Sequence, residues 1–445
     1  MFSRAAFDAL TSDGITRAWT GLGGSHTFVT YPPLDALRSV SPDSVLANMV
    51  DIPLVGLYVH LPFCEMTCPF CPYETHVISD STSSLDIYLR ALTDEMKMIG
   101  KNLRNAEVQS LYIGGGTATV LSEIQLETLF AHLRDHFAFS ADALICVETS
   151  PNALIRNPEK IGLLKHLGAK RVSVGVQTFS ERALRSEGRT HSPDETLEIL
   201  QTLLHEIDVV NIDLMQDMPG QTDEDLDNDI DRIATLRPAQ VTWYVERLRQ
   251  RNGRFPDSYC SVNRRLRLRD RMKELSYRPR PGGRFVRSGC GDDAFKHIRC
   301  GLNSHLVGLG ASAYGHVPGC FYRNTVDTSA YINTALGGNV PIATGAQLRK
   351  LDTFAAALTS GIRWGAGLAQ SDPDLERYVC EAKRRLETLI RHQLVCFDPT
   401  MEKYQITLDG PGWAYEEEIC SLFVPEDVVD QIRAKNLAWW FSRHQ

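Results

Sequence analysis

Short apolar runs alternate with amphipathic segments along most of this chain. Seven runs have the length and apolar character of buried strands: LVGLYVHL (54–61), VQSLYIGGG (108–116), ALICVETSP (143–151), AKRVSVGVQT (169–178), DVVNIDLMQDMPG (208–220), AQVTWYVERL (239–248) and HLVGLGASAYG (305–315). Between them, segments such as 83–103 and 122–137 carry apolar residues at helical spacing. Ser122 precedes the second of these segments, which is typical of a helix start.

This alternation of strands and helices predicts the fold. Repeated strand–helix–strand units form a parallel sheet, so we expect an α/β protein built as a full or partial TIM-like (β/α) barrel. In such folds functional residues gather at the carboxyl ends of the strands. The pattern divides the chain into an N-terminal arm (1–50), a barrel core (51–340) and a small helical or winged C-terminal module (341–445).

Composition and charge narrow the class of protein. The 445 residues are 43% hydrophobic and 23% charged, which is ordinary for a globular protein, and the net charge is −8. A nucleic-acid partner is not expected, because phosphate binding needs a dominant basic surface. The first residues lack the apolar core of a signal peptide, and no stretch is long enough to span a membrane. We therefore expect a cytoplasmic protein without a membrane partner.

One segment departs from the acidic average. Residues 247–287 contain fourteen Arg or Lys against three Asp or Glu. The segment could be an exposed, salt-bridged helical excursion from the core. It could also be a flap that grips an anionic small-molecule substrate, since arginine presents paired donors to carboxylates and phosphates. Both interpretations stay open on the sequence.

Three of the eleven cysteines have the spacing of ligands. Cys64, Cys68 and Cys71 form a C-x3-C-x2-C pattern within eight residues. A zinc ion could bind there if His60 or His76 completed a tetrahedron, although no second C-x2-C pair is present. Iron–sulfur clusters usually take four thiolates, and three would leave one iron open to a small molecule, as catalysis requires. Cys290 and Cys300 are interpreted as spectators or substrate-side thiols.

The residues around this trio resemble a known superfamily. The pattern Tyr58-x-His60-Leu-Pro-Phe-Cys64-x3-Cys68-x2-Cys71 is similar to that of radical S-adenosylmethionine (SAM) proteins, in the branch that resembles oxygen-independent coproporphyrinogen III oxidase. Six further motifs follow in the order of that branch: YIGGGTATVL, VETSPNAL, VSVGVQTFSERALRSEGRTHS, VNIDLMQDMPGQT, VGLGASAYG and YRNTVDTSAYI. The resemblance covers residues 54–345 and is weaker in the C-terminal module.

The resemblance implies a set of cofactors and partners. Cys64, Cys68 and Cys71 would hold a [4Fe-4S] cluster and so act as both metal ligands and catalytic residues. SAM bound at the open iron would be cleaved to methionine and a 5′-deoxyadenosyl radical, which removes a hydrogen atom. Members similar to the coproporphyrinogen oxidase bind two SAM molecules. A small-molecule substrate and an external electron donor, such as flavodoxin or ferredoxin, would complete the system.

The resemblance also assigns residues to the two SAM molecules. Those implied for the cluster-bound molecule are Tyr58, Gly115, Glu148 and Tyr314. Those implied for the second molecule are Phe70, Gly116, Thr117, Gln177, Arg189 and Asp213. Independently of the family, Gly114 to Thr117 end a predicted strand, and glycines let backbone amides approach a zwitterionic ligand closely. Glu246 departs from the branch, which has a small residue there.

Three functions agree with this assignment of residues. The preferred one is that of a class C radical SAM methyltransferase or cyclopropanase, in which the methyl group of the second SAM is activated and added to an unsaturated or aromatic biosynthetic substrate. The alternative is a tetrapyrrole enzyme that decarboxylates coproporphyrinogen or opens heme. The third is a heme chaperone, which is disfavoured because the expected His-Asn-x-x-Tyr-Trp stretch is replaced by FKHIRC.

Overall fold

The structure is a computed structural model that describes residues 2–15, 31–71, 73, 75–78, 83–246, 258–291, 305–365 and 372–443. Its contacts divide the chain into two compact units. One unit contains residues 38–242 and 290–347, and the other contains residues 1–37, 243–289 and 348–445. The second unit therefore combines the start of the chain, the basic segment and the C-terminal module, whereas the sequence pattern placed the basic segment within the core.

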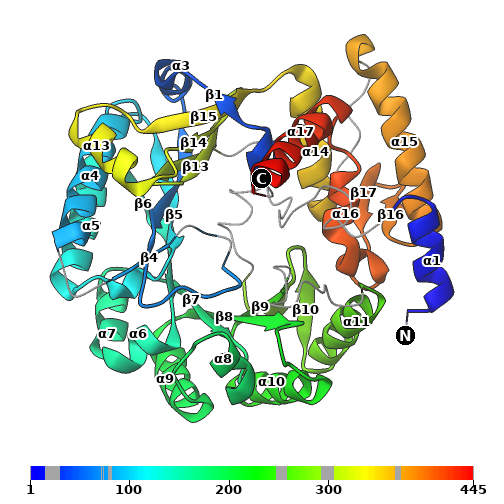
Figure 1. Ribbon diagram of the computed structural model, residues 1–445, viewed down its shortest axis with the longest axis horizontal. Coiled ribbons are helices and arrows are strands. Elements are labelled where there is room, and N and C mark those ends of the chain that lie inside the picture. Colours follow the sequence, from blue (N-terminus) through cyan, green and yellow to red (C-terminus); the bar gives the residue numbers. More distant parts are fainter. Residues whose placement is uncertain are drawn as a thin grey trace. The chain divides into compact units, whose positions relative to one another are not determined.

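The first unit is built on a large, mostly parallel sheet (Figure 1). Its strands lie in the order β1-β15-β14-β13-β12-β2-β5-β6-β7-β8-β9. Neighbours from β12 through β2, β5, β6 and β7 to β8 are parallel, and β12 to β15 are joined by antiparallel pairs. The strands are β1 (Arg38–Ser39), β2 (Leu54–Leu61), β5 (Glu107–Gly115), β6 (Ala138–Thr149), β7 (Arg171–Gln177), β8 (Val209–Gln216), β9 (Gln240–Val245), β12 (His305–Leu309), β13 (Tyr314–Val317), β14 (Cys320–Asn324) and β15 (Ile342–Gln347).

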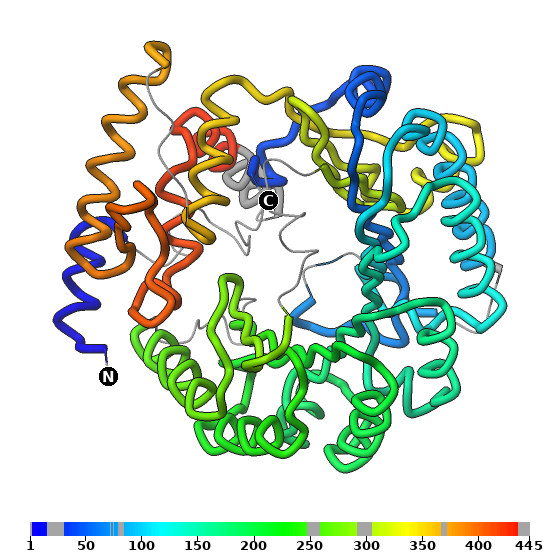
Figure 2. Tube along the Cα trace, turned by 180° about the vertical axis from the view of Figure 1, so that it is seen from behind, coloured from blue at the N-terminus to red at the C-terminus, as the bar shows by residue number. Residues whose placement is uncertain are grey.

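Helices connect most of the strands and cover the outer side of the sheet (Figures 1 and 2). They are α3 (Pro42–Ala47), α4 (Ser83–Gly100), α5 (Glu123–His136), α6 (Pro151–Arg156), α7 (Glu159–His166), α8 (Glu181–Ser186), α9 (Pro193–Glu206), α10 (Asp223–Leu236) and α13 (Thr328–Leu336). Several begin at the residues that favour a helix start. Ser122, Ser192 and Thr222 each form a capping box with the residue three positions later.

The predicted α/β fold with a mostly parallel, TIM-like sheet is confirmed. All seven apolar runs form strands, and β2 has the predicted bounds of 54–61. Strand interiors are buried because parallel strands are covered on both faces. Val55, Leu57 and Val59 on β2, for example, are each at most 2% exposed.

The second unit has a hydrophobic core of its own. It contains α1 (Arg4–Ser12), α11 (Ser258–Glu274), α14 (Lys350–Trp364), α15 (Glu376–Arg391), the β16–β17 hairpin (Val395–Asp398 and Lys403–Ile406), α16 (Glu416–Ser421) and α17 (Glu426–Arg443). Leu10 of the arm and Val262 of α11 pack in the same buried cluster as Leu386 and Ile419 of the C-terminal module. This shared core explains why the arm and the basic segment belong to the C-terminal unit.

Several arginines of the basic segment are buried in this unit. Arg265 lies 4.4 Å from the ring centroid of Trp413 and donates to the carbonyl oxygen of Trp243. Arg269 donates to the carbonyl oxygen of Gly410. Arg284 is 2% exposed and donates to the carbonyl oxygen of Pro281. These residues are neither exposed nor arranged as a surface flap, because their guanidinium groups satisfy backbone carbonyls and stack on tryptophan. Residues 247–257 lie outside the described residues.

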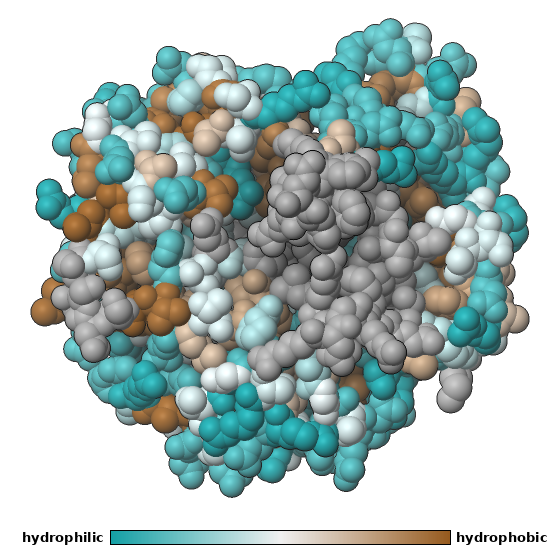
Figure 3. All heavy atoms as spheres, viewed as in Figure 1, coloured by the Kyte–Doolittle hydropathy of each residue, from teal (hydrophilic) through white to brown (hydrophobic). Residues whose placement is uncertain are grey.

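The surface of the first unit is polar over some of its helices and carries exposed apolar residues on others, such as Ile87 of α4 and Ile124 of α5. Figure 3 shows a largely hydrophilic surface over α8 and α10. Within the described residues, every helix is too short or too polar to cross a lipid bilayer.

Candidate active site

The three cysteines lie on one short loop that follows β2. Cys64 ends strand β3 (Phe63–Cys64), which pairs in parallel with β4 (His76–Val77) and so closes the loop. Within it, the Cys71 amide donates to the Cys68 carbonyl over 3.0 Å. Burial raises the pKa of the Cys71 thiol to about 11, and the nearby Cys64 and Cys68 thiols contribute in the same direction. The three thiols are therefore close enough for the charge on one to affect the pKa of another.

These thiols fit an iron–sulfur cluster. Ligating cysteines bind as thiolates, and the positive charge of a bound metal centre overcomes the increase in pKa that burial causes. The two histidines considered for a zinc site each contact a hydroxyl group through one ring nitrogen: Tyr58 Oη lies 2.7 Å from His60 Nδ1, and Thr328 Oγ1 lies 2.7 Å from His76 Nε2. Among the residues that the structure describes, no group of three His, Cys, Asp or Glu side chains could hold a single metal ion.

The glycine-rich turn after β5 packs directly on the cysteine loop. The Gly116 amide donates to the Leu61 carbonyl and the Thr117 amide to the Phe63 carbonyl, each over 2.8 Å. The Thr117 hydroxyl lies 3.8 Å from the Cys64 sulfur. A Cβ atom on Gly116 would stand 2.2 Å from the Phe63 carbonyl oxygen, so no larger residue fits there without moving the backbone.

We expect Gly116→Ala to impair cluster assembly. The added methyl group must push β3 away from the turn, and overpacking of this kind typically costs about 1–3 kcal/mol. The protein should unfold at a lower temperature and take up markedly less iron and sulfide during reconstitution. Gly162→Ala is the matched control, because no atom lies within 4 Å of a Cβ there. Normal iron content in Gly116→Ala would contradict the close packing.

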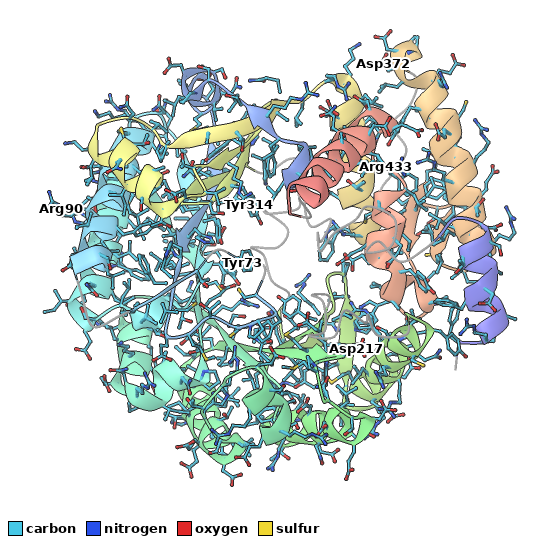
Figure 4. All side chains as sticks on the ribbon, in the orientation of Figure 1. Tyr73, Arg90, Asp217, Tyr314, Asp372 and Arg433 are labelled. Atoms are coloured by element: carbon cyan, nitrogen blue, oxygen red, sulfur yellow. The ribbon has the colours of Figure 1, made fainter. Side chains whose placement is uncertain are left out.

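An acidic group and three tyrosines form a cluster next to the glycine-rich turn. Tyr58 on β2 is opposite Tyr112 on β5, and Tyr112 donates to Glu148 Oε1 over 2.5 Å. The Gly115 amide donates to Glu148 Oε2 over 3.1 Å. Burial raises the pKa of Glu148 above its usual value. The Tyr314 ring is 5.7 Å from that of Tyr58, and Figure 4 shows Tyr314 on the inner side of the curved sheet. Glu148 can still accept hydrogen bonds from ligand hydroxyls, since each carboxylate oxygen has two lone pairs.

A second polar group surrounds Arg189. Its guanidinium donates to the Gly175 carbonyl over 2.7 Å, lies 3.8 Å from the Cys68 sulfur and stands 5.9 Å from the Phe70 ring centroid. Arg189 is 8% exposed, and its Nε has no partner among the described residues. The Gln177 amide oxygen is likewise buried without a partner in the described part of the chain. Buried donors and acceptors normally have partners, so this group fits a polar ligand.

Asp213 is held by neighbours that the sequence analysis did not single out. Its two carboxylate oxygens accept from the Ser173 hydroxyl and the Asn211 amide, each over 2.8 Å. Ser173 is opposite Glu148 in the pairing of β6 with β7. Glu148, Ser173 and Asn211 therefore form one row across three strands, and Asp213 lies two residues further along β8. Polar residues at alternate positions of otherwise apolar strands, as in VSVGVQ and VNIDL, were the available signal.

The predicted site residues come together around the cysteine loop. Thr117 contacts Cys64, Arg189 contacts both Cys68 and Phe70, and Gly175, which binds Arg189, is opposite Asp213 on the next strand. Arg189 follows α8 rather than a strand end. Glu246 belongs to the second unit, and Cys300 lies outside the described residues. The assignment of individual residues to one or the other SAM molecule stays a prediction.

Comparison with known proteins agrees with this geometry. The profile of the Radical SAM superfamily matches residues 58–233. The heme chaperone HemW of Escherichia coli is 30% identical over 197 residues, which are 44% of this chain and 51% of that relative. The oxygen-independent coproporphyrinogen III oxidase of Pseudomonas aeruginosa is 27% identical over 375 residues, which cover 75% of this chain and 80% of that relative.

A solved structure has the same fold. The coproporphyrinogen III oxidase HemN of E. coli, described as a radical SAM enzyme, superposes with a TM-score of 0.77 at 24% identity, over 89% of this chain and 96% of that one. The cofactors of this superfamily are a [4Fe-4S] cluster and SAM, for which the thiol loop and its polar surroundings are suited. The chain is similar to the radical SAM superfamily, and within it to the branch of the oxygen-independent coproporphyrinogen III oxidases and the HemW heme chaperones.

Proposed function

We propose that this protein is a radical SAM enzyme that binds two SAM molecules and acts on a tetrapyrrole. The observation that carries the proposal is the buried group around Arg189, which adds a second polar site beside the thiol loop. Arg189 Nε and the Gln177 amide oxygen have no partner among the described residues, although both are buried. A SAM molecule offers a carboxylate to the first and an amino group or ribose hydroxyl to the second.

Each of the site residues would have a separate role in binding the cluster or SAM. Cys64, Cys68 and Cys71 would hold the cluster, which when bound supplies the electron that cleaves SAM to methionine and a 5′-deoxyadenosyl radical. The Glu148 carboxylate would accept from the ribose hydroxyls of that SAM, and the Tyr58 and Tyr314 rings would exclude water from it. Arg189 would fix the carboxylate of the second SAM molecule by a charge-assisted hydrogen bond.

The relatives favour a tetrapyrrole substrate over the methyl-transfer substrate that the sequence analysis preferred. One relative is named as a coproporphyrinogen III oxidase and another as a heme chaperone. Such a substrate is a small molecule with anionic groups, and a reductant would deliver the electron that the cluster requires. Methylene transfer to an unsaturated carbon uses the same two SAM sites. It therefore remains the second candidate, supported by the same group around Arg189.

Isotope transfer distinguishes these functions. We expect the reduced, reconstituted protein to form about tenfold more 5′-deoxyadenosine with coproporphyrinogen III or heme than without them, a barrier difference of ~1.4 kcal/mol. When the SAM methyl group is deuterated, that 5′-deoxyadenosine should be unlabelled, because the hydrogen comes from the tetrapyrrole. Mass spectrometry of the nucleoside and of the tetrapyrrole is the measurement.

Each other outcome contradicts the proposal in a recognisable way. Deuterated 5′-deoxyadenosine together with S-adenosylhomocysteine would assign the protein to methylene transfer. Stoichiometric heme binding with no substrate-dependent cleavage of SAM would assign it to the heme chaperones.

A further inference from the structure

Strand β7 ends in a backbone conformation that side chains rarely adopt. Gln177, its last residue, has a φ of 72°. This left-handed region is uncommon for residues other than glycine. Such conformations persist only where the surrounding structure holds them, and they are found preferentially at ligand sites. The conformation of Gln177 therefore requires something that holds the chain immediately after it.

A carboxylate from α10 holds that segment. Asp229 accepts from the Phe179 amide over 2.6 Å and from the Thr178 hydroxyl over 2.9 Å. The Thr178 oxygen in turn accepts from the Ser180 amide over 3.0 Å. The three residues that follow Gln177 are thus fixed to a single side chain fifty positions further along the chain.

Asp229 is an unusual residue for its position. It is fully buried, on the same face of α10 as the buried Leu226, Ile230 and Ile233. Burial raises the pKa of Asp229 to about 7, and Asp225 contributes in the same direction. Burying a carboxylate with so few donors is unfavourable, and an apolar residue would pack there more easily. However, an apolar residue would leave the buried Phe179 amide without an acceptor.

The residue held in this way belongs to the second polar group of the site. The Gln177 amide oxygen is buried and has no partner in the described part of the chain. A Cβ atom on Gly175 would stand 3.0 Å from Gln177 Nε2, and the Gly175 carbonyl binds Arg189. Gln177 and Arg189 are thus positioned against the same residue of β7.

We propose that Asp229 is a positioning residue that fixes Gln177 in its left-handed conformation, so that the Gln177 amide faces the second SAM molecule. This inference rests on the proposed function for the identity of the ligand. The contact between Asp229 and the turn does not depend on it. Asp229 would contact neither SAM nor the cluster and would act only through Thr178 and Phe179.

Two measurements on the full-length, reconstituted protein test the inference. In Asp229→Ala, hydrogen–deuterium exchange of the Phe179 amide should rise by about tenfold to a hundredfold, because its acceptor is lost. Equilibrium dialysis should show two SAM molecules bound to the wild type. The second should bind at least about tenfold more weakly to the variant. The iron–sulfur absorbance and the affinity for the first SAM should stay as in the wild type.

Conservative and control variants separate positioning from general damage. Asp229→Asn keeps one carbonyl oxygen for the Phe179 amide and should restore most of the second SAM affinity. If Asp229→Ala does not fold, Asp229→Leu takes its place as the test variant, because it has a similar volume but no acceptor for the Phe179 amide. Asp231→Ala removes the same charge from an exposed position of α10 and should change neither measurement.

The possible results separate this inference from the proposed function. Unchanged exchange at Phe179, or faster exchange with both SAM affinities intact, would overturn the positioning role. A wild type that binds only one SAM would overturn the second SAM site, and with it the ligand assigned to Gln177. The exchange measurement would still decide whether Asp229 holds the turn.

Discussion

Alanine in place of Cys64, Cys68 or Cys71 is expected to abolish both the brown absorbance of the reconstituted protein and all reductive cleavage of SAM. Each thiol would supply one of only three protein ligands, so its loss should leave the cluster too weakly held to be retained. The thiols are held by the β3–β4 pairing and by the glycine-rich turn, so their loss should leave the fold intact. Iron and sulfide analysis, visible absorbance and chromatography of 5′-deoxyadenosine measure the effect.

Cys290 provides the matched control for these variants. It is a free, half-buried cysteine of the same unit, outside the loop that carries the trio. Cys290→Ala should keep the full iron content and the wild-type rate of SAM cleavage. If Cys290→Ala lost the cluster, or if any one variant of the trio kept it, the trio would not be the complete set of ligands.

Arg189→Ala is expected to uncouple SAM cleavage from product formation. Removing one partner of a buried, charge-assisted contact costs about 2–5 kcal/mol, or roughly thirty-fold to several-thousand-fold in affinity. The second SAM should therefore no longer bind at ordinary concentrations. The first SAM keeps Glu148 and the cluster, so slow formation of 5′-deoxyadenosine should continue while the alkylated or oxidised product largely disappears. Dialysis of labelled SAM and product analysis give the two readouts.

Arg185→Ala tests whether a nearby positive charge suffices. Arg185 is on α8, its side chain is 54% exposed and it pairs with Glu181. An exposed pair of this kind contributes little, so the variant should bind both SAM molecules normally. Because Arg189 also lies 3.8 Å from the Cys68 sulfur, the visible spectrum of Arg189→Ala must be recorded. Product formation at the wild-type level in Arg189→Ala would contradict the second SAM site.

Most of the fold and the centre of the site were predictable from local pattern. Apolar runs mark the buried strands because a parallel sheet is covered on both faces, and β2 matches its predicted bounds. The trio of thiols was predictable because its members lie within one loop. Ligand spacing of that kind needs no knowledge of distant contacts.

The features that were not predicted from the sequence depend on contacts between distant segments. In the sequence, Asp229 is one of several acidic residues of the DEDLDNDIDRI helix, and nothing local distinguishes it from the exposed ones. Only the packing shows that its carboxylate is buried against the turn after β7. The buried arginines of the basic segment were missed for the same reason. Charge counts predict solvent exposure, whereas Arg265 and Arg284 lie against Trp413 and Trp364.

The central place of β2 in the sheet has a consequence for synthesis on the ribosome. One edge of β2 pairs with β5, but the other pairs with His305–Leu309 of β12, which is translated much later. At about 5–20 residues per second, that edge stays open for on the order of ten to fifty seconds. An open strand edge invites pairing with another nascent chain. We therefore expect the 58–233 segment to be insoluble when made alone, and cluster insertion to follow completion of the sheet.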